Sequence, residues 1–261
     1  MTEQQDVEHL MLLTGDGGVP FVMTAGPESM RVWAVDGDTM AEVHESLDEP
    51  VTDVAVHHWP GQGFTLVAGT DDGLVHVLDS GAGTTLTVRT LSHDLPIASV
   101  TIAVAREDRY AVVSVDDSGQ LASWALDRHG GAAATGEVAQ VPWMQSAAIG
   151  AAGPDGPIVL TATDDGRVLT WDVGNDAALT PTGHNRAPTG KLVHLAANDT
   201  TVAMAYSSGS VLFADPGHAR FDIAELNVNL SAFGHVQGRG WFLAAHERTV
   251  VALDGLGPGT T

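Results

Sequence analysis

The sequence predicts an all-β fold, a six-bladed β-propeller of four-stranded antiparallel blades whose last blade has three strands. The first observation is a recurring phrase, VAGTDDGLVHVLD from Val67 and LTATDDGRVLTWDV from Leu160, in which an acidic turn separates two short apolar runs. The second is its spacing, because the last residue of the second run recurs every 39 to 47 residues. A repeat of about 40–45 residues is the length of one four-stranded propeller blade. These anchor residues are Trp33, Leu78, Trp124, Trp171, Ala214 and Leu253.

Each copy of the repeat accounts for four strands in order. An innermost strand is expected ahead of the phrase, as in PVTDVAV from Pro50 and PIASVTIAV from Pro96. The two apolar runs of the phrase form the second and third strands, and a more polar outer strand follows, as in GTTLTVRTL from Gly83. The repeats continue without a linker, so one domain is expected over residues 1–261. Its blades are predicted at about 7–46, 47–92, 93–141, 142–183, 184–226 and 227–261.

These residues resemble the WD40 repeat, in a degenerate form of bacterial type. In the segment from Leu91 to Asp127, His93 falls on the family's Gly-His pair, and Ser114 and Trp124 fall on its structural Ser and Trp. The family's turn Asp is replaced by Ser118. The resemblance covers nearly the whole chain and implies a propeller fold without fixing a function. It implies structural roles for His93, Ser114, Trp124, Thr161, Asp165, Trp171 and Trp33.

Composition limits the classes of partner. The net charge is −22, with 33 acidic and 11 basic residues. Such a field repels nucleic acids and anionic membranes, and it attracts a protein or peptide with a basic surface. A second interpretation is that the charge serves solubility and reflects GC-rich codon usage. There is no cysteine, and the polar N-terminus and the lack of a long apolar run predict a cytoplasmic protein without a signal peptide.

The acidic turns are the first candidate site. The resemblance implies that Asp71, Asp116 and Asp164, with their neighbours Asp72, Asp117 and Asp165, gather on the face that also carries the links between blades. One interpretation is an acidic rim that binds a basic peptide or a hard cation. The other is that these carboxylates hydrogen-bond their own turns. No loop has a calcium-binding spacing, so we expect no metal and no cofactor.

Two links between copies are the other candidates for partner binding. The link VPWMQS offers Trp143 and Met144, and exposed Trp is a common interface residue. The long link at residues 180–191 holds His184, Asn185 and Arg186 between prolines and glycines. A plain insertion and a packed Trp143 are the alternatives.

The function expected is a non-catalytic scaffold that binds a protein or peptide through loops on one face. No nucleophile elbow, P-loop or dinucleotide-binding motif is present. The alternative is a small-molecule-binding protein or biosynthetic enzyme that acts at the mouth of the central channel, using Asp and His for acid–base chemistry. Adjacent His57 and His58 point to opposite sides of an extended segment and so do not form a chelate.

The last repeat is short, because the chain ends where its outer strand is expected to begin. Three interpretations are open: a blade left short, a fragment of a longer protein, or an apolar edge at residues 249–254 that pairs with a partner strand.

Overall fold

The computed structural model describes most of the chain as β-strands. The described residues are 9–47, 49–81, 86–104, 109–128, 134–140, 144–153, 156–163, 167–174, 176–186, 192–197, 202–215, 220–225, 230–236, 240–245 and 250–253. Within these ranges there are 23 strands and one short 3-10 helix, Asp16–Gly18, and no α-helix. The prediction of an all-β protein is therefore confirmed.

The strands of the described part form six antiparallel sheets, each a simple meander in chain order. Sheet 1 contains β1 (His9–Thr14), β2 (Pro20–Ala25), β3 (Met30–Asp36) and β4 (Thr39–Leu47). Sheet 2 contains β5 (Val51–Trp59), β6 (Gly63–Thr70), β7 (Leu74–Ser80) and β8 (Leu86–Ser92). Sheet 3 contains β9 (Ile97–Val104), β10 (Arg109–Asp116), β11 (Gln120–Asp127) and β12 (Ala134–Gln140).

The second half of the chain continues the pattern. Sheet 4 contains β13 (Met144–Gly153), β14 (Gly156–Thr163), β15 (Arg167–Val173) and β16 (Leu179–Arg186). Sheet 5 contains β17 (Leu192–Ala197), β18 (Val202–Tyr206), β19 (Ser210–Asp215) and β20 (Arg220–Glu225). In the described residues sheet 6 has three strands, β21 (Leu230–Val236), β22 (Gly240–Ala245) and β23 (Val250–Leu253).

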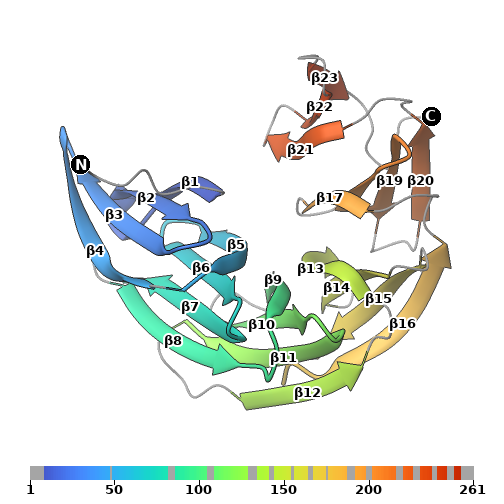
Figure 1. Ribbon diagram of the computed structural model, residues 1–261, viewed down its shortest axis with the longest axis horizontal. Coiled ribbons are helices and arrows are strands. Elements are labelled where there is room, and N and C mark those ends of the chain that lie inside the picture. The colour runs from blue at the N-terminus through green and yellow to red at the C-terminus, as the bar shows by residue number, and fades with distance from the viewer. Residues whose placement is uncertain are drawn as a thin grey trace.

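The sheets follow one another around an arc (Figure 1). The first strand of each sheet lies on the inside of the arc and the last strand on the outside, which is the order that the sequence predicts. The inner strands β5, β9, β13, β17 and β21 lie next to one another in succession.

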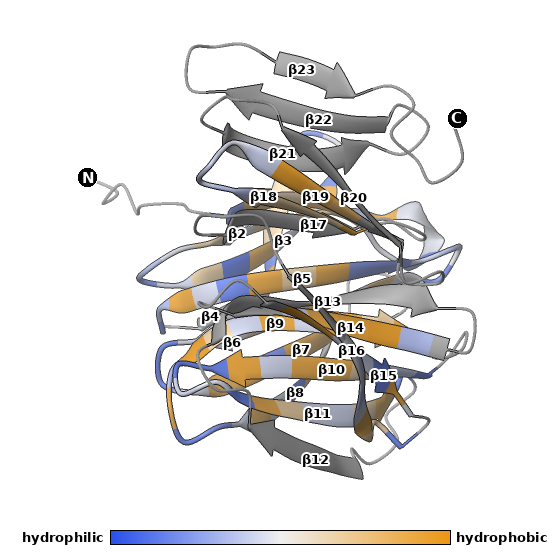
Figure 2. Cartoon of the chain, turned by 90° about the vertical axis from the view of Figure 1, so that its right-hand side faces the viewer, coloured by the Kyte–Doolittle hydropathy of each residue, from blue (hydrophilic) through white to orange (hydrophobic). Residues whose placement is uncertain are grey.

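The core lies between neighbouring sheets. Phe21 and Met23 of sheet 1 pack with Phe64 and Leu66 of sheet 2, and further clusters join sheet 2 to sheet 3 and sheet 3 to sheet 4. Strands such as β6 and β10 are buried along nearly their whole length, because sheets 2 and 3 are covered on both faces. Figure 2 shows the hydrophobic residues concentrated along β10 and β14.

Two anchor Trp residues lie in this core, as expected. Trp124 is 8% exposed and Trp171 is 6% exposed. The indole Nε1 of Trp171 donates to Thr161 Oγ1 over 3.0 Å, a bond that satisfies both buried polar groups. Trp33 is different, because its side chain is only half-buried.

The described parts of the two predicted links, residues 144–146 and 180–186, belong to strands. Residues 184–186 belong to β16, where Leu169 pairs with His184, Val168 with Asn185 and Arg167 with Arg186. The prediction of a loop at residues 184–186 is wrong, because an outer strand tolerates polar residues at its solvent-facing edge. Met144 likewise begins β13, opposite Thr163.

Candidate functional site

The turns between second and third strands and the links between sheets share one face, which we call the turn face. In sheet 2, the Asp71 N–H donates to Pro50 O over 3.0 Å, so the β6–β7 turn lies against the link that precedes β5. The same contact recurs in sheet 3, where the Asp117 N–H donates to Pro96 O over 3.0 Å. Because two successive sheets use the same bond, the repeat in the sequence is also a repeat in the arrangement of this face.

A bond between sheets joins these units into one surface. The His93 N–H donates to Gly73 O over 2.8 Å, which brings the β8–β9 link onto the β6–β7 turn. Gly73 has φ +86°, and a Cβ at this position would lie 2.8 Å from Leu95 O and 2.9 Å from His93 O. Only glycine therefore allows this close approach without a shift of the link.

The exposed side chains of this surface are mainly acidic. Asp71, Asp72, Asp94 and Asp117 are exposed, and Leu95 lies among them with 44% of its surface exposed. Asp72 also closes its own turn, because its Oδ1 accepts from Thr70 Oγ1 over 2.5 Å. The arrangement offers an apolar contact bordered by carboxylates.

Asp116 does not belong to this exposed set, which corrects our expectation for that residue. Its side chain is buried, and Oδ1 accepts from Ser118 Oγ (2.6 Å) and from the N–H groups of Ser118 (2.9 Å) and Gln120 (3.0 Å). Burial alone raises the pKa of a carboxyl group, but these bonds and the one to His93 lower the pKa of Asp116 below its usual value. The carboxylate is already satisfied inside the turn.

His93 connects this turn to the middle of sheet 3. Its Nε2 lies 2.5 Å from Ser114 Oγ and its Nδ1 lies 3.2 Å from Asp116 Oδ2. The ring also meets Trp124 edge-on, with 5.6 Å between ring centroids. Asp116, two residues before Ser118, is therefore the carboxylate of this turn that contacts His93.

Of the predicted site residues, Asp71 is exposed on the turn face, as described above. The others lie at or beyond the limits of the described part. Trp143, Asp164 and Asp165 lie outside the described residues. The strand positions of Met144, His184, Asn185 and Arg186 are described, but their side chains are not.

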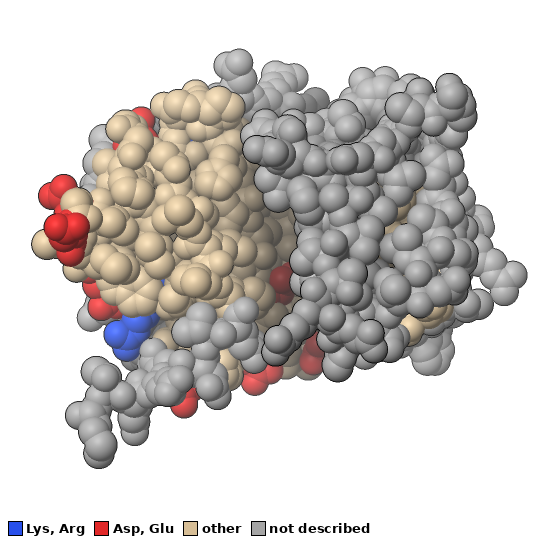
Figure 3. Space-filling view, turned by 90° about the horizontal axis from the view of Figure 1, so that it is seen from above, with Lys and Arg blue, Asp and Glu red and all other residues tan. Residues whose placement is uncertain are grey.

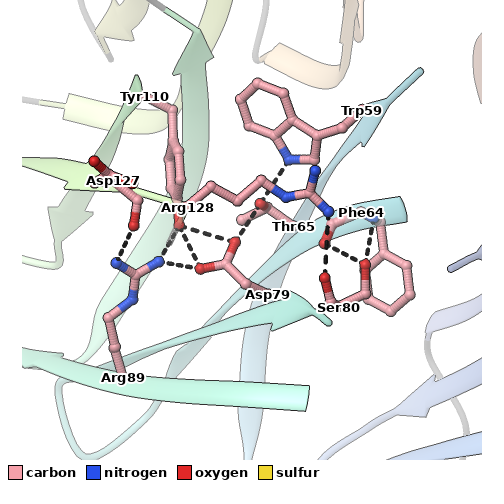
Figure 4. Close-up of polar contacts among 9 residues, drawn as sticks. All are labelled: Trp59, Phe64, Thr65, Asp79, Ser80, Arg89, Tyr110, Asp127 and Arg128. Carbon is pink, nitrogen blue, oxygen red and sulfur yellow. Dashed lines mark hydrogen bonds and ion pairs between the residues drawn. The ribbon is translucent and has the colours of Figure 1, made fainter. Parts of the chain in front are cut away.

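A second polar cluster, centred on Asp79, joins sheets 2 and 3 (Figure 4). Asp79 is 2% exposed, and its carboxylate accepts from Thr65 Oγ1 (2.5 Å) and from the Tyr110 hydroxyl (2.9 Å). Arg89 forms an ion pair with the same carboxylate and donates to Asp127 O over 2.8 Å. Burial, and then the charge of Asp79, raise the pKa of Tyr110 well above its ordinary value.

Arg128 extends the Asp79 cluster toward the β5–β6 turn. Its guanidinium donates to Gln62 Oε1 (3.0 Å) and Ser80 O (3.2 Å), and lies 5.5 Å from the centre of the Trp59 ring. Burial lowers the pKa of Arg128, although a guanidinium stays charged at neutral pH. Nearly every charged atom of this cluster has a partner within the chain. Because several of these bonds cross from sheet 2 to sheet 3, the cluster holds the two sheets together.

One member of this cluster follows an anchor residue in the sequence, because Asp79 comes directly after Leu78. Its partners could not be found from the sequence, because they come from residues between Trp59 and Arg128 on several strands. Trp59 ends β5 and is buried, and its Nε1 donates to Thr65 Oγ1 over 2.8 Å.

Asp53 makes a similar connection nearer the inside of the arc. Its Oδ2 accepts from Ser99 Oγ (2.8 Å) and Val100 N (2.9 Å), which ties β5 to β9. Burial raises the pKa of Asp53 in spite of these bonds.

The described residues contain no group of three or more His, Asp or Glu arranged to hold a metal ion. Among the same residues, none of the helical structure is long and apolar enough to cross a bilayer.

No protein-family model and no curated protein matches this sequence. Solved structures do resemble the fold. The crystal structure of BBS1N in complex with ARL6DN aligns with a TM-score of 0.69 and 12% identity, over 95% of this chain and 79% of that chain. Saccharomyces cerevisiae Sqt1 aligns with a TM-score of 0.68 and 12% identity, over 93% and 68% of the two chains. Chaetomium thermophilum Raptor gives 0.64 and 13%, over 97% of this chain and 23% of that chain.

BBS1 and Sqt1 are WD40 β-propeller proteins. At this level of identity the likeness concerns the fold alone. Together with the meander sheets arranged around an arc, it is consistent with the class that the sequence predicts, a β-propeller.

Proposed function

We propose that this chain is a six-bladed, WD40-like scaffold that binds a basic, partly apolar segment of another protein through its turn face. The observation that carries the proposal is the exposed Leu95 bordered by Asp71, Asp94 and Asp117. An apolar side chain surrounded by carboxylates fits a ligand that has Lys or Arg on either side of an apolar residue. The solved complex of BBS1N with ARL6DN supports the proposal in general terms, since a chain of similar fold there has a protein partner.

The net charge of −22 supports the same choice of ligand. It accelerates encounter with a basic segment and opposes encounter with phosphate-rich surfaces. The alternative, an enzyme at the mouth of the channel, has less support in the described part. In the described inner strands the acidic residue is Asp53. Its carboxylate already accepts hydrogen bonds from Ser99 and Val100, which hold it in a structural role.

A peptide titration tests the proposal. The probe is a labelled peptide of about twelve residues with Leu between pairs of Arg, measured by fluorescence anisotropy. We expect Asp71→Asn with Asp117→Asn to weaken binding about three- to tenfold at low salt, and Leu95→Ser to weaken it about tenfold.

Two matched variants serve as controls. Asp172→Asn with Asp176→Asn removes the same charge from exposed positions that lie on neither proposed surface, and Val88→Ser changes an apolar side chain that is 39% exposed. Both should bind like the wild type. The proposal is wrong if the two Asp pairs have equal effects, because binding would then follow net charge and not the turn face.

A further inference from the structure

One face of sheet 1 is apolar and uncovered, and we call it the free face. On the other face, Leu13, Phe21 and Met23 pack against sheet 2. Side chains alternate along each strand, so the residues between them point the opposite way. The register places Leu12 beside Val22, Val22 beside Trp33, and Val35 beside Met40 on this second face.

The side chains of the free face are the most exposed large apolar groups of the described part. Leu12 is 75% exposed, Leu10 71% and Met40 55%. Val22, Trp33 and Val35 are half-buried between them. Isolated exposed apolar residues need no explanation, but a contiguous set across four strands indicates an interaction surface.

Charges lie mainly at the border of this face. Glu42 is opposite Trp33 on the outer strand, and Asp36 and Asp38 follow at the β3–β4 turn, all exposed. Arg31, which pairs with Thr24, is half-buried. Figure 3 shows a broad area without charged side chains over this end of the molecule, with Asp and Glu at its left edge.

The geometry points to a sheet as the covering element. Sheets 2 and 3 are covered on both faces by neighbouring sheets, and the face of sheet 1 toward sheet 2 is covered in the same way. Sheet 6 lies at the other end of the arc (Figure 1) and leaves Leu10 and Leu12 exposed. The exposed charges beside the free face are Asp36, Asp38 and Glu42, and Arg31 is half-buried, so a basic partner complements this face better than a second copy with the same acidic border.

We propose that the free face docks a β-hairpin or sheet of a partner protein, with apolar residues on one face and Lys or Arg at its strand ends. The apolar face would cover Leu10, Leu12 and Met40, and the basic ends would meet Asp36, Asp38 and Glu42. This surface is separate from the turn face, so either site can exist without the other.

The first experiment asks whether the face is uncovered in the free protein. The chain has no cysteine, so one introduced thiol reports one position. We expect Leu12→Cys to react with iodoacetamide as fast as Val88→Cys, and Ala68→Cys, at a position with 0% exposure, to react about a hundredfold more slowly. Slow reaction of Leu12→Cys at all protein concentrations would show that the chain covers its own face. Slow reaction only where light scattering detects a dimer would assign the face to a second copy. Either result overturns the proposal.

The second experiment supplies the partner chemistry. The probe is a synthetic hairpin of about sixteen residues with Val and Trp on one face and Lys at both ends, compared with the same hairpin carrying Glu. The Lys hairpin should slow the reaction of Leu12→Cys about tenfold and leave Val88→Cys unchanged, whereas the Glu hairpin should protect neither. Glu42→Lys should reduce protection by the Lys hairpin and increase protection by the Glu hairpin. Equal protection by the two hairpins, or none by either, contradicts the proposal.

Discussion

At the scale of single residues, the Asp79 cluster shows how a buried hydroxyl links stability to pH. Tyr110 is 2% exposed and its hydroxyl donates to the Asp79 carboxylate. Ionising it would place two negative charges together in the core, so the folded protein keeps the proton. Thr65 and Arg89 keep the carboxylate satisfied in the same cluster.

This residue predicts a loss of stability at alkaline pH. The pKa of Tyr110 is raised in the folded state, whereas in the unfolded chain it stays near 10. Above about pH 10 the unfolded chain loses this proton and the folded protein does not, so the free energy of unfolding falls as pH rises. Tyr110→Phe should cost about 1.5–3 kcal/mol at pH 7 and reduce this alkaline slope. Urea denaturation at pH 7, 9 and 10.5 measures both effects.

The chain offers an internal check, because it has only two Tyr residues. Burial raises the pKa of the second, Tyr206, to about 12. Native protein should therefore show little tyrosinate absorbance at pH 10.5. Normal titration near pH 10 in the folded state would contradict the burial of both rings.

At the scale of elements, the turn face depends on close contact between the β6–β7 turn and the β8–β9 link. Gly73 and Gly61 both have positive φ, at +86° and +70°, but no atom lies within 4 Å of the Cβ position of Gly61. Gly61→Ala should cost about 1 kcal/mol from backbone strain alone. Gly73→Ala should cost about 1–3 kcal/mol more because Cβ would meet Leu95 O and His93 O. Thermal or urea unfolding of the pair measures the difference, and equal losses would show that the link is not in contact with the turn.

The anchor Trp residues give a second prediction about elements. Trp124→Ala and Trp171→Ala each remove a ring from between packed sheets and should cost about 3–5 kcal/mol. Trp33→Ala should cost about 1 kcal/mol, since one face of sheet 1 is already uncovered. Losses of equal size at all three positions would mean that Trp33 is covered in solution.

At the scale of the whole molecule, the repeat was the part that could be predicted from the sequence. The strand–turn–strand phrase is local, so its apolar alternation and acidic turn predict the sheets directly. The face shared by turns and links followed from the resemblance, and the bonds of Asp71 to Pro50 and Asp117 to Pro96 show it for sheets 2 and 3. Because turns and links share this face, Asp71 of the β6–β7 turn and Leu95 of the β8–β9 link lie on the same surface.

The features that were missed depend on contacts between distant segments. Asp116 was expected on the surface because the sequence does not show that Ser118, Gln120 and His93 converge on its carboxylate. Residues 184–186 were expected in a loop because an outer strand has no apolar pattern to identify it. The free face of sheet 1 could not be predicted, because apolar residues alternate along its strands in the same way as in a sheet that is covered on both faces.

The central claim is that the turn face binds a basic segment, and hydrogen–deuterium exchange with the Arg and Leu peptide tests it most directly. Saturating peptide should slow amide exchange at residues 71–73, 93–95 and 117–119, and leave residues 61–63, in the β5–β6 turn, unchanged. The effect should weaken as salt rises, because these carboxylates are exposed. Protection that falls outside the turn face, or that is the same in the Asp71→Asn with Asp117→Asn variant, would contradict the account.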